Sequence, residues 1–343
     1  MDADWSPLGV VMPNIVYRER GTELGTVFGQ QSSLVAMSEK WLNWPHAFVR
    51  KGVNTVGRAA ALVLGLRDHL SVLKALSGDG TKEILSHFPR VAYRYTLPYL
   101  SVAIPRERRV LMFKGHYQFI NEKFQPQFLS RVLDGSLSLW SCSLNGLDID
   151  ISMSGPCLTT KHREGDLALF IKVNGQLLGK LGFSIVPIET LVTPLSFDPD
   201  DAKGTHVLVI GQVQGQSGCF EQIKALTKAC SDISPLDLLM SALAGFAESV
   251  GAAYMVGVSQ HNNISFNDDT FSVSKGYFDY NGFWSKYGGV ENADGDFCIR
   301  IPIADKPINL IKAKHRGRNL AKRAFKAGVT DSAKGALSWF VAR

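Results

Sequence analysis

The sequence predicts an α+β fold, with a mixed central sheet and flanking helices preceded by a helical N-terminal region. Apolar residues recur at helical spacing in the first third of the chain, whereas short alternating runs begin near Gly135. Residues 206–261 then combine a strand, a glycine-rich link, two helices and a second strand. We therefore expect a mainly helical region over 1–132, an α+β domain over 133–330 and a short tail over 331–343.

Helical segments are expected ahead of the sheet. Leucines recur at three-to-four spacing from Leu62 to Leu73, and the SGDG at 77–80 ends this run. A second helical piece is expected over 81–104. Pro105 stands where a third helix would begin, because proline is tolerated in the first turn.

Strands are expected from residue 137 onward. Four runs have strand-like patterns: LSLWS (137–141), LDIDISM (147–153), DLALFIKV (166–173) and QLLGKLGFSIV (176–186). Asn174-Gly175 separates the last two and favours a two-residue hairpin turn. Residues 187–205 are expected to form an exposed loop, and a late strand is expected over 297–303.

Composition limits the class of protein. The 343 residues carry a formal charge of +6 and an isoelectric point near 9.0, which favours an acidic partner such as nucleic acid, an anionic membrane face or a phosphorylated cofactor. Five cysteines without a C-x-x-C pair predict neither a disulfide framework nor a zinc site. No metal is expected.

The N-terminal sequence does not resemble a secretory signal. MDADWSPLG has no apolar core behind a basic flank, and the longest apolar run, at 59–66, is far short of the roughly 20 residues of a spanning helix. We expect a cytoplasmic protein. Peripheral contact with the inner-membrane face is compatible with this expectation. Gly-x-Ser-x-Gly, phosphate-loop and His-Glu-x-x-His motifs do not occur.

The link after the strand HVLVIG (206–211) is a candidate anion site. The first N–H groups of a helix lack intrahelical partners, and glycine allows a phosphate to approach the backbone closely. Six residues of the link are candidate ligands: Gln212, Gln214, Gly215, Gln216, Ser217 and Gly218. The alternative is a turn that only connects a strand to a helix.

Catalytic candidates follow the second strand. His261 comes directly after YMVGVS (254–259), where an open sheet places ligand-facing groups, and it has the intrinsic pKa of a general base. Asp279 is a candidate partner for it, with Asp268 as the alternative, and Tyr280 is a candidate acid. A capping or surface role for His261 and core packing of the aromatic segment are the alternatives.

Several ordered segments resemble the bacterial VirK/YbjX family across roughly residues 90–320. They are YLSVAIPRERRVLMFKGHYQF, REGDLALFIKVNGQLLGKLGFSI, VLVIGQVQG, LTKACSDISPLDLLMSALAGFAESVGA and FDYNGFWSKYGG. The resemblance implies a part in cell-envelope maintenance and resistance to antimicrobial peptides. The segment after His261 departs from the family by being shorter and less basic.

Gln212-x-x-Gly215-x-Ser217 also resembles the Gln/Arg-x-x-Gly-x-Gly/Ala loop with which GNAT acyltransferases hold the pyrophosphate of coenzyme A. This implies a GNAT-like domain, a coenzyme A or acyl-carrier thioester as donor, and an envelope lipid or peptide as acceptor. It also implies that a tyrosine, Tyr280 or Tyr277, protonates the leaving thiolate. Two departures are the serine at the third position and the presence of two helices where that fold has one.

Residues 306–326 contain no acidic residue and eight basic ones. A solvated helix is the default interpretation of this segment. Contact with anionic lipid is the second, supported by Trp339 and Phe340, and nucleic-acid binding is not expected because interleaved aromatic residues are missing. A non-catalytic envelope factor that uses this segment is therefore the alternative to a transferase.

Overall fold

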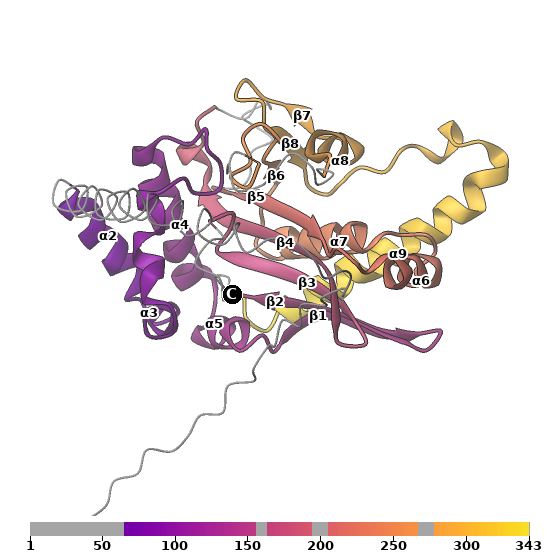
Figure 1. Cartoon of the computed structure of the whole chain (residues 1–343), viewed down its shortest axis with the longest axis horizontal. Helices are drawn as coiled ribbons and strands as arrows, with labels where there is room; N and C mark the ends of the chain where they lie inside the picture. The colour runs from indigo at the N-terminus through magenta and orange to yellow at the C-terminus, as the bar shows by residue number, and fades with distance from the viewer. Residues whose placement is uncertain (1–64, 156–162, 194–204, 267–277, 343) are drawn as a thin grey trace, which may run out of the picture. The chain divides into compact units, whose positions relative to one another are not determined.

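The computed structural model describes residues 65–155, 163–193, 205–266 and 278–342. Within them, helices and strands follow the order expected for an α+β protein (Figure 1). The expected helical pattern before residue 65 lies outside the described residues, and so do Cys157, Asp268, Tyr277 and most of the 187–205 loop. Residues 58–343 form one compact unit, so the expected boundaries at 132 and 330 both fall inside it.

The helical elements are α2 (Leu66–Leu76), α3 (Lys82–His87), the 3-10 helix η1 (Pro89–Thr96), α4 (Arg106–Lys123), α5 (Pro126–Leu133), α6 (Phe220–Ala229), α7 (Pro235–Ser249), α8 (Tyr280–Lys286) and α9 (Ala313–Leu337). The strands are β1 (Leu137–Leu144), β2 (Leu147–Ser154), β3 (Leu167–Val173), β4 (Gln176–Pro187), β5 (His206–Gly215), β6 (Tyr254–Gly257), β7 (Val290–Glu291) and β8 (Phe297–Arg300).

The strands form one mixed sheet in the order β1-β2-β3-β4-β5-β6-β8-β7. Antiparallel pairing runs from β1 to β5, and β5 with β6 is the single parallel pair among the described strands. Asn174 and Gly175 both have positive φ between β3 and β4, which confirms the predicted hairpin. The mixed α+β class is likewise confirmed.

Helices cover both faces of the sheet. Ser184 of β4 faces the α4 side, where it contacts Asp166, while the neighbouring Phe183 packs edge-on against Phe246 of α7. Successive strand residues point to opposite faces, so α4 and α7 lie on opposite sides of β4. Figure 1 shows α2, α3 and α4 gathered at one side and α7 with α9 at the other.

Helices α7 and α9 cross at close range. A Cβ at Gly245 would clash with the carbonyl oxygen of Thr330, so the crossing requires glycine. The Thr330 hydroxyl also donates to the carbonyl of Ser241 at 3.0 Å. α9 contains most of the basic segment and the first part of the expected tail, and its C-terminal half is held against the core.

Two boundaries differ from expectation. Residues 81–104 form α3 and η1 rather than one helix, because Pro89 removes a backbone donor. β5 continues to Gly215 instead of ending at 211, since its antiparallel pairing with β4 extends to Gly179. Half of the expected link is thus strand.

Candidate functional site at the ends of the parallel strands

The parallel strands β5 and β6 stop pairing part-way along β5. Their last aligned pair is Ile210 with Gly257, and β5 then continues for five residues. The register with β4 shifts here, since Ile210 pairs with Phe183 and Gln212 with Gly182, which leaves Gly211 as a bulge. The carboxyl ends of adjacent parallel strands are where open sheets present ligand-binding groups.

Beyond Ile210, side chains rather than a neighbouring strand form hydrogen bonds with the backbone carbonyls on this edge of β5. Asn263 donates from Nδ2 to the Gly211 carbonyl at 2.8 Å, and the Tyr280 hydroxyl donates to the Val213 carbonyl at 3.1 Å. The residues after β6 and the start of α8 are thereby held against β5. β5, the residues after β6 and the start of α8, which were all predicted to contribute to a site, therefore meet at this edge.

Tyr280 is largely enclosed. Burial, reinforced by the negative charge of Glu164, raises the pKa of its phenol well above the ordinary value. The hydroxyl is therefore protonated at neutral pH and acts as a donor. Glu164 is itself buried and accepts from the backbone N–H and the hydroxyl of Ser265 at 3.2 and 2.5 Å.

Asp279 and His261 lie on the exposed side of this edge. The carboxylate of Asp279 caps α8 by accepting from the Gly282 N–H at 2.9 Å, which gives it a structural task. His261 is exposed in a turn whose Gln260 N–H donates to Oδ1 of Asn281 at 3.1 Å. That bond places the turn beside the first turn of α8.

The candidate residues of the link differ in exposure. Gln212 is buried within the strand, whereas the five from Gln214 to Gly218 are exposed. The Gln216 N–H donates to the Leu178 carbonyl at 2.9 Å, and Gly218 has a φ of +77° that favours glycine. No side chain caps the first turn of α6, so its N–H groups are open to the loop.

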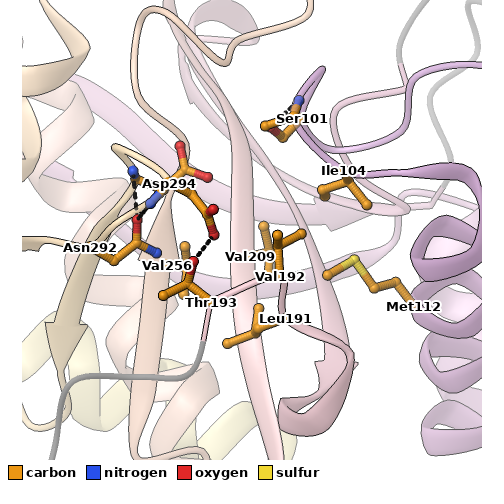
Figure 2. Close-up of a pocket in the computed structure, with 12 residues that line it drawn as sticks. Ser101, Ile104, Met112, Leu191, Val192, Thr193, Val209, Val256, Asn292 and Asp294 are labelled. Atoms are coloured by element: carbon orange, nitrogen blue, oxygen red, sulfur yellow. Dashed lines mark hydrogen bonds between the residues drawn. The ribbon is translucent and has the colours of Figure 1, made fainter.

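A small cavity lies on the α4 side of the same strand pair (Figure 2). Val209 and Val256 form its floor, and Thr193 donates its hydroxyl to Asp294 at the rim. Its volume of about 30 Å³ has room for water molecules but not for a pantetheine arm. Nearby, burial raises the pKa of Asp296, whose Oδ1 accepts from the Ser259 N–H at 2.9 Å.

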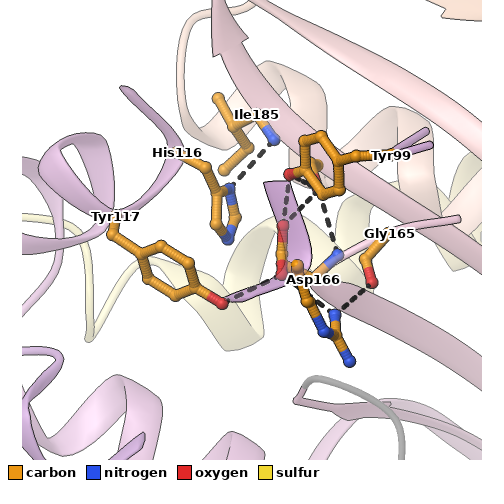
Figure 3. A network of polar contacts seen from close by, with 8 residues as sticks. Tyr99, His116, Tyr117, Gly165, Asp166 and Ile185 are labelled. Carbon is orange, nitrogen blue, oxygen red and sulfur yellow. Dashed lines mark hydrogen bonds and ion pairs between the residues drawn. The ribbon is translucent and has the colours of Figure 1, made fainter. Parts of the chain in front are cut away.

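A buried network fastens the segment before β3 to the sheet (Figure 3). The carboxylate of Asp166 accepts from the hydroxyls of Tyr99, Tyr117 and Ser184, the last two at 2.9 and 3.0 Å. Arg94 forms an ion pair with the same carboxylate at 3.0 Å. Each carboxylate oxygen thus has two donors.

Several neighbouring groups stabilise the negative charge of Asp166. Burial opposes ionisation of Asp166, but Arg94 and the two tyrosine hydroxyls lower its pKa below the usual range. Burial lowers the pKa of His116, whose Nδ1 accepts from the Ile185 N–H at 3.1 Å. His116 is therefore neutral, with its proton on Nε2.

Glycines let this segment lie directly on the sheet. A Cβ at Gly165 would clash with the backbone of Phe183, and one at Gly211 would clash with the carbonyl of Glu164. Asp166 fixes one end of the contact, and Glu164 beside it borders Tyr280. Sequence reasoning missed both acids, because REGD differs in no visible way from a polar turn.

Among the described residues, no group of three or more histidines, cysteines, aspartates or glutamates is arranged to hold a metal ion. No helix within the same residues is both long and apolar enough to cross a membrane. The four cysteines that the structure describes are free thiols.

A family model described as "Protein of unknown function (DUF535)" matches residues 62–325. The chain belongs to this family. It is 25% identical over 239 residues to "Uncharacterized protein YbjX" of Escherichia coli (strain K12), and the alignment covers 68% of each protein. The resemblance to the VirK/YbjX family is thereby confirmed. No solved structure matches the chain.

Replacing Asp166 with Asn should destabilise the fold by about 3–5 kcal/mol, because it leaves the largely buried Arg94 without its counter-charge. The folded-state pKa of Asp166 is lowered, so its contribution is present above about pH 4 and is lost as pH falls through that pKa. Urea unfolding at several pH values measures both effects.

The matched control is Asp79→Asn, which removes an exposed partner of Lys82 and should cost less than about 0.5 kcal/mol. A difference between Asp166→Asn and wild type that persists unchanged below pH 3 would contradict the assignment of charge to Asp166.

Proposed function

We propose that the protein is a transferase that moves an acyl group from a coenzyme A or acyl-carrier thioester to an amine or hydroxyl of an envelope lipid or peptide. The observation that carries the proposal is the edge of β5 beyond Ile210. There the protonated phenol of Tyr280, the turn that holds His261 and the exposed loop before α6 are close together in the fold. A donor, an acid and a base are the parts such a reaction requires.

The chemistry assigns one task to each group. His261 removes a proton from the acceptor, whose nitrogen or oxygen attacks the thioester carbonyl and forms the new bond to carbon. The carbon–sulfur bond then breaks, and Tyr280 donates a proton to the departing thiolate. Asp279 supports this indirectly, because its cap holds the first turn of α8 and so the position of Tyr280.

The donor would lie across the loop from Gln214 to Gly218. These residues are exposed, and the uncapped N–H groups of α6 complement negative charge. The order β5-β6-β8-β7 and the Gln212-x-x-Gly215-x-Ser217 sequence support a GNAT-like assignment. Gln212 is buried within the strand, so in this proposal it does not contact the donor on the exposed surface of the loop.

The resemblance to the family supports the proposed acceptor class and location. The VirK/YbjX resemblance implies work on the cell envelope and a role in resistance to antimicrobial peptides, which fits a lipid or peptide acceptor. A cytoplasmic enzyme would meet both thioester donors and the inner face of the membrane. No metal takes part in the proposed steps.

Gly215→Asp should abolish donor binding, because it adds negative charge where the pyrophosphate or carrier phosphate would lie. A Cβ there meets no atom within 4 Å, so the fold is preserved. Calorimetric titration with coenzyme A and a long-chain acyl-CoA measures this; micromolar binding by wild type corresponds to about −8 kcal/mol. Gly328→Asp, also in open space, is the control, and equal dissociation constants for the two variants would reject the loop assignment.

Tyr280→Phe should lower the rate of thiol release from acyl-CoA by about a hundredfold with little change in KM for the donor, because it removes the proton donor and leaves the exposed loop from Gln214 to Gly218 unchanged. Tyr287→Phe is the control, since that residue directly follows the same helix and its hydroxyl donates to Asp237 instead. Unchanged turnover in Tyr280→Phe, or an equal loss in both variants, would remove Tyr280 from the mechanism.

A non-catalytic envelope factor is the second candidate. It is favoured by the exposure of the basic residues that begin α9, which could contact an acidic partner or an anionic membrane. Cells that carry His261→Ala together with Tyr280→Phe separate the two candidates. A transferase would lose its cellular role, whereas a factor acting through α9 would keep it.

A further inference from the structure

We propose that the amino-terminal half of α9 is a surface for docking on an anionic lipid bilayer. We call the residues from Lys312 to Ala327 the α9 basic surface. This inference is independent of the thioester proposal, because none of these residues contributes to the edge of β5. It concerns where the protein is held, not what it catalyses.

The α9 basic surface stands clear of the core. Apart from a few half-buried positions, its side chains are exposed, whereas Val329, Ala333 and Leu337 further along the helix are buried. Figure 1 shows the amino end of α9 projecting away from the sheet. The carboxyl-terminal half of α9 is therefore packed on the core, and the amino-terminal half, here called the presented half, is exposed.

The outward side of the presented half is apolar. Its residues recur at spacings of four and three, which places them on one face of a helix. They are Ala313, Gly317, Leu320, Ala324 and Ala327, all exposed. Leu320 is 53% exposed and Leu310, just before the helix, is 64% exposed. Small side chains around one leucine allow the helix to lie close to a flat surface.

Cations border this apolar face. Arg316 and Arg323 precede Gly317 and Ala324 by one residue on one border, and Lys314 lies on the other. Long basic side chains beside an apolar face can reach lipid headgroups while the face contacts the acyl boundary. This arrangement suits a bilayer better than a nucleic acid, which offers no apolar surface to Leu320.

The charge of the presented half is poorly neutralised by the protein. Asp232 pairs with Arg318 at 2.7 Å and Asp305 with Arg323 at 3.5 Å. No described carboxylate pairs with Lys312, Lys314 or Arg316. The first turn of α9 also has no acidic residue, so these cations add to the positive end of the helix dipole. Anionic headgroups would supply the missing negative charge.

Vesicle flotation of the full chain tests the inference. Wild type should float with vesicles of phosphatidylcholine and phosphatidylglycerol, float little with phosphatidylcholine alone, and lose binding as salt is raised. The triple variant Lys312→Gln, Lys314→Gln, Arg316→Gln should bind about a hundredfold more weakly, since each cation near an anionic bilayer contributes roughly fivefold.

The control triple is Lys74→Gln, Arg90→Gln, Lys123→Gln. These residues are exposed on α2, η1 and α4, and both triples lower the net charge by three, from +6 to +3. All six side chains lie outside the core, so both proteins should fold. Equal binding by the two triples would show that net charge alone acts, and would overturn the α9 assignment.

A second variant tests the orientation of the helix. Leu320→Asn leaves every charge in place but should weaken binding about tenfold, because it removes the largest apolar group of the outward face. Unchanged binding by Leu320→Asn would reject contact through that face. Retention on immobilised polyglutamate without flotation on any vesicle would reject the bilayer in favour of an acidic polypeptide.

Discussion

The carboxylate of Asp166 is the interaction on which the centre of the fold depends. It joins η1, α4, β4 and the segment before β3 through four donors, in a place where water cannot replace any of them. A buried charge is tolerated only when it is paired and fully hydrogen-bonded. The N-terminal helices are thus held to the sheet by hydrogen bonds and an ion pair as well as by apolar packing.

This attachment also sets the surroundings of the candidate site. Asp166 and the glycines at 165, 182 and 211 keep the preceding chain in contact with β4 and β5. Glu164 is consequently held where its negative charge reinforces the effect of burial on the pKa of Tyr280. A segment that is remote in sequence therefore adds to the raised pKa of the acid proposed for the transfer step, while burial is the larger cause.

The sequence allowed prediction of features with local causes. Asn174-Gly175 specified its hairpin, and the strand-like runs located β1 to β4. The Asp166 network could not be predicted, because its partners lie 18 to 72 residues away. The burial of Gln212 was missed for the same reason, since pairing with β4 extends β5 beyond its apolar run.

The way β5 ends has a consequence for association between molecules. Between Gly211 and Val213 the strand has a hydrogen-bonding edge that β6 does not cover, and an open edge invites pairing with another chain. Asn263 and Tyr280 occupy its carbonyls in place of a strand. These two side chains therefore protect the molecule against intermolecular sheet growth, so a residue suited to proton transfer also serves solubility.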